Sequence, residues 1–394
     1  MDSSGYRARA LIVCGTRPEI IKLAPVHRAF EASGRIDGLL CATGQHDDMA
    51  THTFAAFGLS PDVRIEPFGG ESTLNALVSR LMAELERVIR RSAPDLILVQ
   101  GDTASALAGA LSGFCCRVPV AHVEAGLRSF DLKVPFPEEG FRAGIAQIAA
   151  LHFPPTPRAA DNLRSAGIPA ERILVTGNTV TDAALAMSAR CDGWPATLPA
   201  LPDGAPLVLV TAHRRESWGQ GIESIARAVA TLHDALPHVH LLFPVHLNPR
   251  VQSSVRERLT GYERVHLLPP LDYQQFIPVL RRASLVLTDS GGIQEEAPTF
   301  GVPVLVMRDV TERPEAVEAG LARLVGTEHD VIVAAALQLL QDEAARQTMA
   351  QRSNPFGDGR ASERIVRAAE RFLDGHELAS DESEAFSPAV VSPV

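Results

Sequence analysis

Short, continuous apolar runs alternate with longer amphipathic segments along most of this chain, and this alternation constrains the fold more than any other feature. Apolar runs of about five residues without polar alternation are typical of strands that are covered on both faces. The segment Glu19–Ser33, which follows the first run, places Leu23, Val26 and Phe30 near one face of a helix. Strand–helix alternation of this kind predicts parallel sheets joined by right-handed crossovers.

A break rich in proline and glycine, Cys191–Pro206, divides the apolar runs into two groups. We therefore predict two open α/β domains of similar size. The predicted strands before the break are Ala10–Cys14, Gly38–Thr43, Asp95–Gln100, Pro119–Val123, Leu151–Pro154 and Arg172–Thr176. Those after the break are Leu207–Thr211, Val239–Pro244, Arg264–Leu268, Ser284–Thr288, Val302–Met307 and Leu321–Val325.

The length of 394 residues also fits two domains, at roughly 100–200 residues per domain. We assign residues 1–176 to an N-terminal Rossmann-like domain and residues 177–360 to a C-terminal one. Residues 361–375 are periodic and predict a helix that packs back toward the N-terminal domain. The tail, residues 376–394, is acidic and rich in Ser and Pro, which predicts disorder.

The net charge of −10 argues against a nucleic-acid partner or an anionic membrane surface, since both demand a basic face. A small anionic ligand is compatible with this charge, because a few Arg, Lys and helix N-termini can hold phosphates locally. No stretch approaches the ~18 uncharged apolar residues of a membrane span. The five cysteines form no C-x-x-C, so reduced thiols in a cytoplasmic protein are the simplest interpretation.

Polar clusters follow the carboxyl ends of many predicted strands, which is where open α/β sheets bind ligands. Two domains that each carry such an edge suggest a cleft between them. In the first half the clusters are Gly15–Glu19, Gly44–His46, Gly101–Thr103 and His122–Arg128. In the second half they are Ala212–Glu216, Val245–Pro249, Asp289–Gly292 and Arg308–Glu315.

The first cluster has both a structural and a functional interpretation. Thr16-x-x-Glu19 matches a capping box with a proline in the first helical turn. This explains Thr16 and Glu19 but not Arg17, whose charge opposes the helix dipole and therefore favours contact with an anion. Lys22, one turn further along, could join the same anion site or be solvated.

Three clusters of the second half suggest phosphate contacts. Ser290, Gly291 and Gly292 form either an ordinary turn or a cradle whose backbone N–H groups approach a phosphate. His213 and the two arginines after it carry charge that an anion or a carboxylate must balance. His246 fits a structural histidine equally well.

Carboxylates dominate the loops of the first half. Asp102 follows a strongly apolar run and could serve the chemistry or N-cap the next helix. Glu124 could pair with Arg128, and Glu138 is the first of two adjacent glutamates in a Pro-rich loop. Several carboxylates that converge on one cleft are what proton abstraction and return require.

Common cofactor and metal signatures are absent from the sequence. No G-x-G-x-x-G follows the first apolar run, and no G-x-x-x-x-G-K-[ST] occurs. The His and Cys spacings offer no zinc site. We expect neither a cofactor nor a metal.

Ten motifs stand in order from about residue 10 to residue 372: GTRPEIIKLAP, GQH, GDTASAL, HVEAGLRS, PEEGFR, GNTVTDA, TAHRRES, PVHLNP, LTDSGGIQEEAPTFGVPVLVMRDVTERPEAV and NPFGDGRAS. Together they resemble the non-hydrolysing UDP-N-acetylglucosamine 2-epimerase family. The resemblance implies two Rossmann-like domains facing across a cleft, in a glycosyltransferase-B-like fold. It implies interconversion of UDP-N-acetylglucosamine and UDP-N-acetylmannosamine by elimination and re-addition of UDP through 2-acetamidoglucal, with no cofactor.

The resemblance also assigns expected roles to individual residues. Asp102, Glu124 and Glu138 resemble the acid–base carboxylates, and His213 resembles the catalytic histidine near the UDP phosphates. Expected substrate contacts are Arg17, Lys22, Arg142, Phe276, Ser290, Gly291, Gly292, Glu296 and Arg313. An allosteric site for a second UDP-N-acetylglucosamine would use Gln45, His46, Arg214 and His246.

Two departures from the family pattern are present. Phe141 stands where the family has Asn, and Asp47-Asp48 follow Gln45-His46 in place of Arg and Glu or Gln, which weakens the expected allosteric site. Members of the family usually form homodimers. The alternatives are a hydrolysing epimerase, an epimerase of a modified UDP-sugar, a glycosyltransferase of the same architecture and a non-catalytic UDP-sugar sensor.

Overall fold

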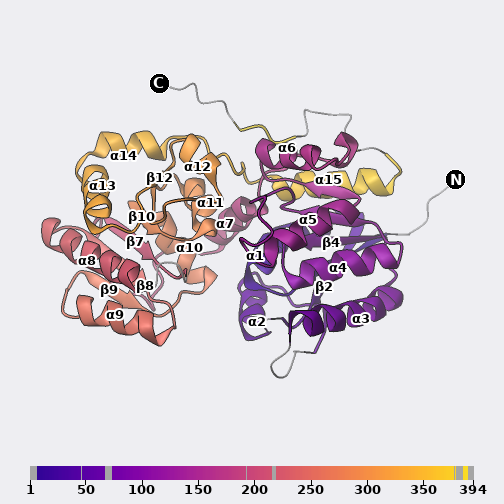
Figure 1. The fold of residues 1–394 in the computed structure, drawn as a ribbon, viewed down its shortest axis with the longest axis horizontal. Coiled ribbons are helices and arrows are strands. Elements are labelled where there is room, and N and C mark those ends of the chain that lie inside the picture. The colour runs from indigo at the N-terminus through magenta and orange to yellow at the C-terminus, as the bar shows by residue number, and fades with distance from the viewer. Residues whose placement is uncertain are drawn as a thin grey trace. The chain divides into compact units, whose positions relative to one another are not determined.

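The structure is a computed structural model that describes residues 7–45, 47–66, 73–191, 193–214, 219–376, 378 and 385–388. The chain forms two compact units (Figure 1). The first comprises Met1–Ala183 and Phe356–Ser387, and the second comprises Ala184–Pro355 and Pro388–Val394. The chain therefore leaves the first unit after Ala183 and returns to it at Phe356.

The first unit is built on a six-stranded sheet in the order β3-β2-β1-β4-β5-β6, in which all pairs are parallel. Its strands are β1 (Ala8–Cys14), β2 (Ile36–Ala42), β3 (Val63–Arg64), β4 (Leu96–Gln100), β5 (Val120–Val123) and β6 (Leu151–Phe153). Its helices are α1 (Arg17–Ser33), α2 (Asp47–Ala56), α3 (Leu74–Ser92), α4 (Ala104–Cys115), α5 (Glu138–Ile148), α6 (Pro157–Ser165), η1 (Ala170–Arg172) and α15 (Ala361–Leu373). Helix α7 (Thr179–Arg190) begins in this unit and runs into the second.

The second unit repeats the architecture, with a parallel sheet in the order β12-β11-β10-β7-β8-β9. Its strands are β7 (Leu207–Thr211), β8 (His240–Pro244), β9 (Val265–Leu268), β10 (Leu285–Thr288), β11 (Val304–Val306) and β12 (Ala322–Leu324). Its helices are α8 (Gln220–Ala235), α9 (Pro249–Leu259), α10 (Tyr273–Arg282), α11 (Gly291–Glu296), η3 (Ala297–Phe300), α12 (Pro314–Glu318), α13 (His329–Gln341) and α14 (Glu343–Ala350).

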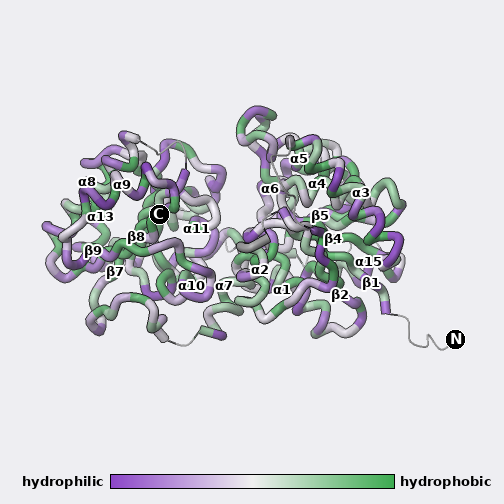
Figure 2. The backbone as a smooth tube through the Cα atoms, turned by 90° about the horizontal axis from the view of Figure 1, so that it is seen from below, coloured by the Kyte–Doolittle hydropathy of each residue, from purple (hydrophilic) through white to green (hydrophobic). Residues whose placement is uncertain are grey.

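Continuous apolar strands form the cores of both units, as the sequence predicts. Every residue of β4 is buried, and so is every residue of β7. Figure 2 shows hydrophobic residues concentrated along these central strands. Two Rossmann-like units of parallel strands and covering helices confirm the predicted fold class. No helix among the described residues is long and apolar enough to cross a membrane.

Eleven of the twelve predicted runs are strands, with ends that differ by at most two residues. The prediction for Arg172–Thr176 is wrong, because this segment makes one isolated bridge, between His152 and Ile173. Its backbone still donates to the carbonyls of His152 and Pro154 at 3.0 and 3.1 Å. The strand that the sequence does not predict, β3, pairs only two residues with the end of β2.

The C-terminal helix α15 packs against α1 of the first unit. Arg35 joins them through ion pairs with Asp374 at 2.8 Å and Glu370 at 3.4 Å. Beyond this helix, the described residues include Phe386, which is buried and whose backbone N–H donates to the carbonyl of Val175 at 2.8 Å. This part of the tail is therefore packed against the first unit.

Candidate functional site

Glu19 organises the loops at the carboxyl ends of β1 and β4. Its carboxylate accepts hydrogen bonds from the backbone N–H groups of Gly15 and Thr16, at 2.9 and 2.7 Å, and from the hydroxyl of Thr16 at 2.8 Å. It also accepts the hydroxyl of Thr103 at 2.6 Å. Burial raises the pKa of Glu19 in spite of these donors. The predicted capping box is present, and it additionally ties α1 to the loop that carries Asp102.

Asp102 lies in that loop, two residues after the end of β4, and forms an ion pair with Arg142 of α5. The cap of α4 is provided by Thr103, whose hydroxyl accepts from the backbone N–H of Ala106 at 3.1 Å. The alternative of Asp102 as the N-cap is therefore wrong. Beneath the loop, His122 Nε2 lies 2.7 Å from the carbonyl oxygen of Gly101, and burial lowers the pKa of His122 to about 4. A neutral His122 thus donates to the turn that positions Asp102.

Glu124 follows β5 and is buried. Its backbone has a φ of 60°, a left-handed conformation that non-glycine residues rarely adopt and that often marks functional sites. Its carboxylate pairs with Lys22 of α1 and accepts from Asn178 Nδ2 at 3.1 Å. Arg128, the partner that the sequence offers as an alternative, donates its Nε to Glu139 at 2.6 Å.

The adjacent glutamates at the start of α5 have different environments. Glu139 is fully buried and accepts from Arg128 and from the backbone N–H groups of Ser129 and Phe130, at 3.0 and 3.1 Å. Burial acts to raise the pKa of Glu139, but these donors leave it below its usual value. Glu138 is half-buried, and its Oε2 is a buried acceptor with no hydrogen-bond partner among the described residues. Of the two, Glu138 is the one whose carboxylate keeps an acceptor unused within the described part of the chain.

In the second unit, the ends of β7 and β10 bring His213 and Asp289 together. Asp289 is fully buried and accepts from the backbone N–H groups of His213 and Arg214, at 3.0 and 2.9 Å. Its Oδ1 lies 3.1 Å from His213 Nδ1. Although burial acts to raise it, the pKa of Asp289 is lowered by these contacts. The sequence analysis assigned Asp289 no role of its own, and its position directly after an apolar strand was the signal.

Arginines gather near the start of α11. Arg214 and Arg308 both donate to Glu312, at 3.1 and 2.8 Å. Burial acts to raise the pKa of Glu312, but the two guanidinium groups lower it to about 2. Arg313 pairs with Glu295. A side chain at Gly291 would meet Arg214 Nη2 at 3.7 Å and the guanidinium carbon of Arg313 at 3.9 Å, so both cations flank this glycine.

The remaining predicted contacts of the second unit lie in or beside α10 and α11. Ser290 precedes α11 and donates its backbone N–H to the hydroxyl of Thr288 at 2.9 Å. Gly292 and Glu296 belong to α11, and the Glu296 side chain is buried. Phe276 lies in α10, stacked on Tyr273 with 6.5 Å between ring centroids.

Arg17 and the predicted allosteric residues are distributed over both units. Arg17 is the first residue of α1 and is half-buried. Gln45, of the first unit, accepts from the hydroxyl of Ser105 at 2.7 Å. Arg214 and His246 belong to the second unit, where His246 Nδ1 accepts from the backbone of Asn248 at 3.1 Å. His46 lies outside the described residues.

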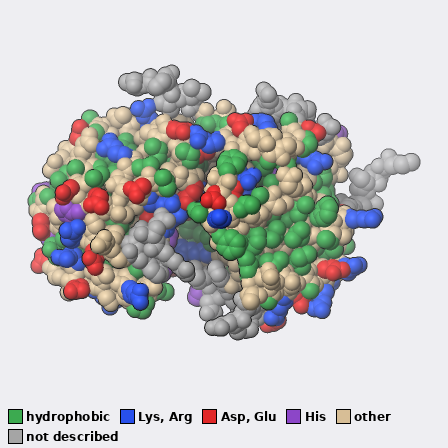
Figure 3. All heavy atoms as spheres, viewed as in Figure 1, with side chains coloured by type: hydrophobic (Ala, Val, Ile, Leu, Met, Phe, Trp, Pro, Cys, Tyr) green, Lys and Arg blue, Asp and Glu red, His purple; other side chains and the backbone are tan. Residues whose placement is uncertain are grey.

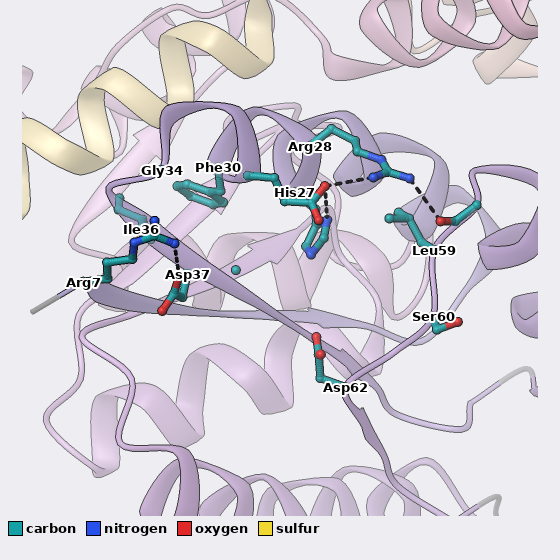
Figure 4. Close-up of a pocket in the computed structure, with 13 residues that line it drawn as sticks. Arg7, His27, Arg28, Phe30, Gly34, Ile36, Asp37, Leu59, Ser60 and Asp62 are labelled. Carbon is teal, nitrogen blue, oxygen red and sulfur yellow. Dashed lines mark hydrogen bonds and ion pairs between the residues drawn. The ribbon is translucent and has the colours of Figure 1, made fainter. Parts of the chain in front are cut away.

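A cavity of about 440 Å³ lies elsewhere in the first unit, at the amino ends of β1 and β2 (Figure 4). Its arginines are already paired, Arg7 with Asp37 at 3.3 Å and Arg28 with Glu31 at 2.9 Å. None of the predicted site residues lines it. Among the described residues, no group of three or more His, Cys, Asp or Glu side chains could hold a metal ion.

A family model described as UDP-N-acetylglucosamine 2-epimerase matches residues 28–370. The chain belongs to the UDP-N-acetylglucosamine 2-epimerase family. The family member from Salmonella typhimurium (strain LT2), UDP-N-acetylglucosamine 2-epimerase, is 43% identical over 371 residues, which cover 92% of this chain and 99% of the relative.

Solved structures of the 2-epimerase family agree with this assignment. UDP-GlcNAc 2-epimerase from Neisseria meningitidis, bound to UDP-GlcNAc, is 36% identical with a TM-score of 0.84, over 93% of this chain and 100% of that one. S. aureus MnaA, in a co-structure with UDP, is 38% identical with a TM-score of 0.83, over 96% of this chain and 100% of that one. The resemblance to UDP-N-acetylglucosamine 2-epimerases is thereby confirmed, and so is the glycosyltransferase-B-like fold that it implies.

Proposed function

We propose that this chain interconverts UDP-N-acetylglucosamine and UDP-N-acetylmannosamine by inverting carbon 2, without releasing free sugar. The observation that carries the proposal is the division of chemistry between the units. The first unit gathers Asp102, Glu124 and Glu138 at one sheet edge, and the second holds an oriented His213 beside arginines. The binding of UDP-GlcNAc by the Neisseria relative supports the choice of substrate.

The chemistry of carbon 2 explains why carboxylates are needed. Its proton is not acidic, because no carbonyl group flanks that carbon. Elimination of UDP removes the proton and breaks the bond between carbon 1 and the phosphate oxygen, which yields 2-acetamidoglucal. Re-addition of UDP returns a proton to the opposite face of carbon 2. One carboxylate must act as a base and another group as an acid, and we propose Asp102, Glu124 and Glu138 for these roles.

The departing UDP carries negative charge that must be stabilised. His213, held through Nδ1 by Asp289, is proposed to face the phosphates together with the cations beside Gly291. We propose that the other nucleotide-sugar contacts are made by Arg17, Lys22, Arg142, Phe276, Ser290, Gly291, Gly292, Glu296 and Arg313. Lys22 pairs with Glu124, and Arg142 pairs with Asp102. These two cations would therefore stabilise the charges of the carboxylates as well as contact the ligand.

Incubation with UDP-N-acetylglucosamine in D2O, followed by proton NMR, tests the proposal. We expect the manno epimer of the nucleotide sugar to appear with deuterium at carbon 2. Free N-acetylmannosamine as the main product would instead identify a hydrolysing epimerase. No exchange at carbon 2 would refute the proposal for this substrate and direct the search to modified UDP-sugars.

We further propose that the protein works as a homodimer. Hydrophobic side chains gather over α3, α4 and α5 (Figure 3), and Phe114 of α4 is 59% exposed. The sequence of α4, ASALAGALSGFC, contains no charged residue, so its outer face is apolar as well as its inner one. Monomers seldom expose large apolar patches. Light scattering should show a dimer, which Phe114→Asp should convert to monomer; a monomeric wild type would refute this part of the proposal.

The state of the cysteines supports a cytoplasmic location, which we also propose. All five are free thiols, two of them buried. Burial raises the pKa of Cys41 to about 12, so this thiol stays protonated and unreactive. Free thiols are typical of a reducing compartment.

A further inference from the structure

We propose that Asn178 is a positioning residue for Glu124. Its amide would hold the Glu124 carboxylate in one ionised, oriented state and link it to the two segments through which the chain passes between its units. The inference rests on the proposed function, since it presumes that Glu124 takes part in proton transfer.

The contact itself is buried on both sides. Asn178 is 2% exposed and Glu124 is 7% exposed, and Asn178 Nδ2 donates to Glu124 Oε2 at 3.1 Å. The backbone of Glu124 is left-handed, so surrounding contacts must hold this residue in place. Lys22 supplies charge to the same oxygen, and Asn178 supplies a directional donor.

The other polar groups of Asn178 are bound to the connections between the units. Asn178 Oδ1 accepts from the backbone N–H of Val180 at 3.1 Å, in the first turn of α7. Helix α7 carries the chain out of the first unit after Ala183. The backbone N–H of Asn178 donates to the carbonyl of Phe356 at 2.5 Å, and Phe356 is the first residue of the returning segment.

The two segments pack so closely that a side chain on either glycine at their crossing would force its neighbour to shift. A Cβ on Gly177 would lie 3.2 Å from the Cα of Gly357. A Cβ on Gly357 would lie 3.2 Å from the Thr181 hydroxyl oxygen. In addition, Asp182 of α7 accepts from the backbone N–H of Ser362 at 2.7 Å, at the start of α15. A shift of either segment would therefore move Asn178.

The amide donor has a predictable effect on proton transfer. A hydrogen bond donated to a carboxylate favours its ionised form, so loss of the donor raises the pKa of the acid. If Glu124 must be ionised in one step of the reaction, the acidic limb of the pH–rate profile should move to higher pH. A residue that is only structural would lower the amount of folded enzyme and leave the limb where it is.

The decisive variant is Asn178→Asp. It keeps an oxygen that can accept from Val180 and keeps the backbone bond to Phe356, but it replaces the donor facing Glu124 by an acceptor. Asn178→Ser withdraws the Nδ2 donor from Glu124 without adding charge to a buried site, because the serine hydroxyl lies closer to the backbone than the amide nitrogen. The matched control is Asn162→Asp, because Asn162 Nδ2 donates to the carbonyl of Gly126 at 2.9 Å in the same loop and not to a carboxylate.

The experiment measures kcat for UDP-N-acetylglucosamine epimerisation against pH, in variants whose cooperative thermal unfolding shows them folded. We expect the midpoint of the acidic limb to move to higher pH, by about one unit in Asn178→Ser and by more in Asn178→Asp. In Asn162→Asp the midpoint should stay at the wild-type pH. One outcome overturns this inference but not the proposed function. In it, the wild type exchanges the proton at carbon 2 for deuterium, while the folded Asn178 variants have the same acidic limb as the wild type. A wild type without exchange removes the proposed function and this inference with it.

The link to the returning segment is tested by a double-mutant cycle. Gly357→Ala should push the segment away from Thr181 and shift the limb in the same direction as Asn178→Ser. In the Asn178→Ser background the same change should have little further effect, since the coupling runs through the amide. Additive shifts would show that Gly357 acts on the enzyme independently of Asn178 and would refute the link.

Discussion

His213 Nδ1 lies 3.1 Å from Asp289 Oδ1, and the same carboxylate accepts the backbone N–H of His213. Since an ionised carboxylate only accepts hydrogen bonds, Nδ1 must carry the proton that is donated to it. This fixes the tautomer, and it leaves Nε2 as the ring nitrogen that could face a ligand. The Asp289 side chain is fully buried whereas that of His213 is 47% exposed, so Asp289 is the fixed partner.

Asp289→Asn should therefore lower turnover more than it lowers substrate affinity. The variant keeps the size of the side chain but loses the charge that orients the imidazole. We expect kcat to fall about 100-fold with a small change in KM, in the range seen for positioned acid–base groups. Steady-state kinetics with UDP-N-acetylglucosamine provides the measurement. A higher KM with an unchanged kcat would contradict the orienting role.

The two glutamates of α5 should separate stability from catalysis. Glu139→Gln removes the negative charge that pairs with Arg128. This change should destabilise the protein by about 3 kcal/mol, as for other broken buried ion pairs. Glu138→Gln should cost less than about 0.5 kcal/mol in stability and at least ~100-fold in turnover. Urea unfolding and steady-state kinetics on both variants test the pair. Equal effects of the two changes on both measurements would refute the distinction.

Acid should weaken the ion pairs of Glu312. The pKa of Glu312 is about 2 in the folded protein, against 4.5 as its ordinary value, so these pairs stabilise the fold above about pH 4.5. The contribution is lost as the pH falls toward 2. Because the side chain is 39% exposed, screening limits the effect to about 1 kcal/mol.

Comparison of the wild type with Glu312→Gln isolates this contribution from the rest of the acid titration. The difference in free energy of unfolding, measured in urea at several pH values, should be about 1 kcal/mol at pH 7. It should shrink between pH 4.5 and pH 2.5. A difference that stays constant over this range would mean that the charge of Glu312 contributes nothing to stability.

Asp102→Asn should lower turnover at least ~100-fold, the lower range for acid–base catalysis. The loss would come from the carboxylate that pairs with Arg142, since Thr103 and not Asp102 caps α4. Asp161→Asn is a suitable control, because Asp161 is an exposed aspartate that pairs with Arg164 on the surface of α6. Near-normal turnover of Asp102→Asn would remove this residue from the proposed acid–base set.

The sheets could be predicted because buried parallel strands are visible as apolar runs. The strand Leu207–Thr211 has the same bounds in the sequence analysis and in the structure. The run Arg172–Thr176 has a similar composition but forms only one bridge to β6. Whether a segment pairs along its whole length depends on its path beside the neighbouring strand, and composition does not determine that path. The edge strand β3 has only two residues and therefore no pattern.

The location of the site could be predicted, but its side-chain partners could not. Carboxyl ends of parallel strands meet at one edge, so the loops of Asp102 and Glu124 were expected there. Which cation pairs with each carboxylate depends on spatial distances between residues that are far apart in the chain. Lys22 and Glu124 are separated by 102 positions, and nothing in their local sequences points to each other.

Phe386 should anchor the tail, which the sequence alone predicts to be disordered. Its ring lies 5.7 Å from the Arg364 guanidinium, and a Cβ on Gly177 would touch it at 3.6 Å. Phe386→Ala should therefore destabilise the first unit, by about 2 kcal/mol if the ring contributes what a buried large side chain does. Val331→Ala, at a 49% exposed position, is the control and should change stability by less than about 0.5 kcal/mol. Equal thermal unfolding midpoints for Phe386→Ala and wild type would show that the tail contact contributes no stability.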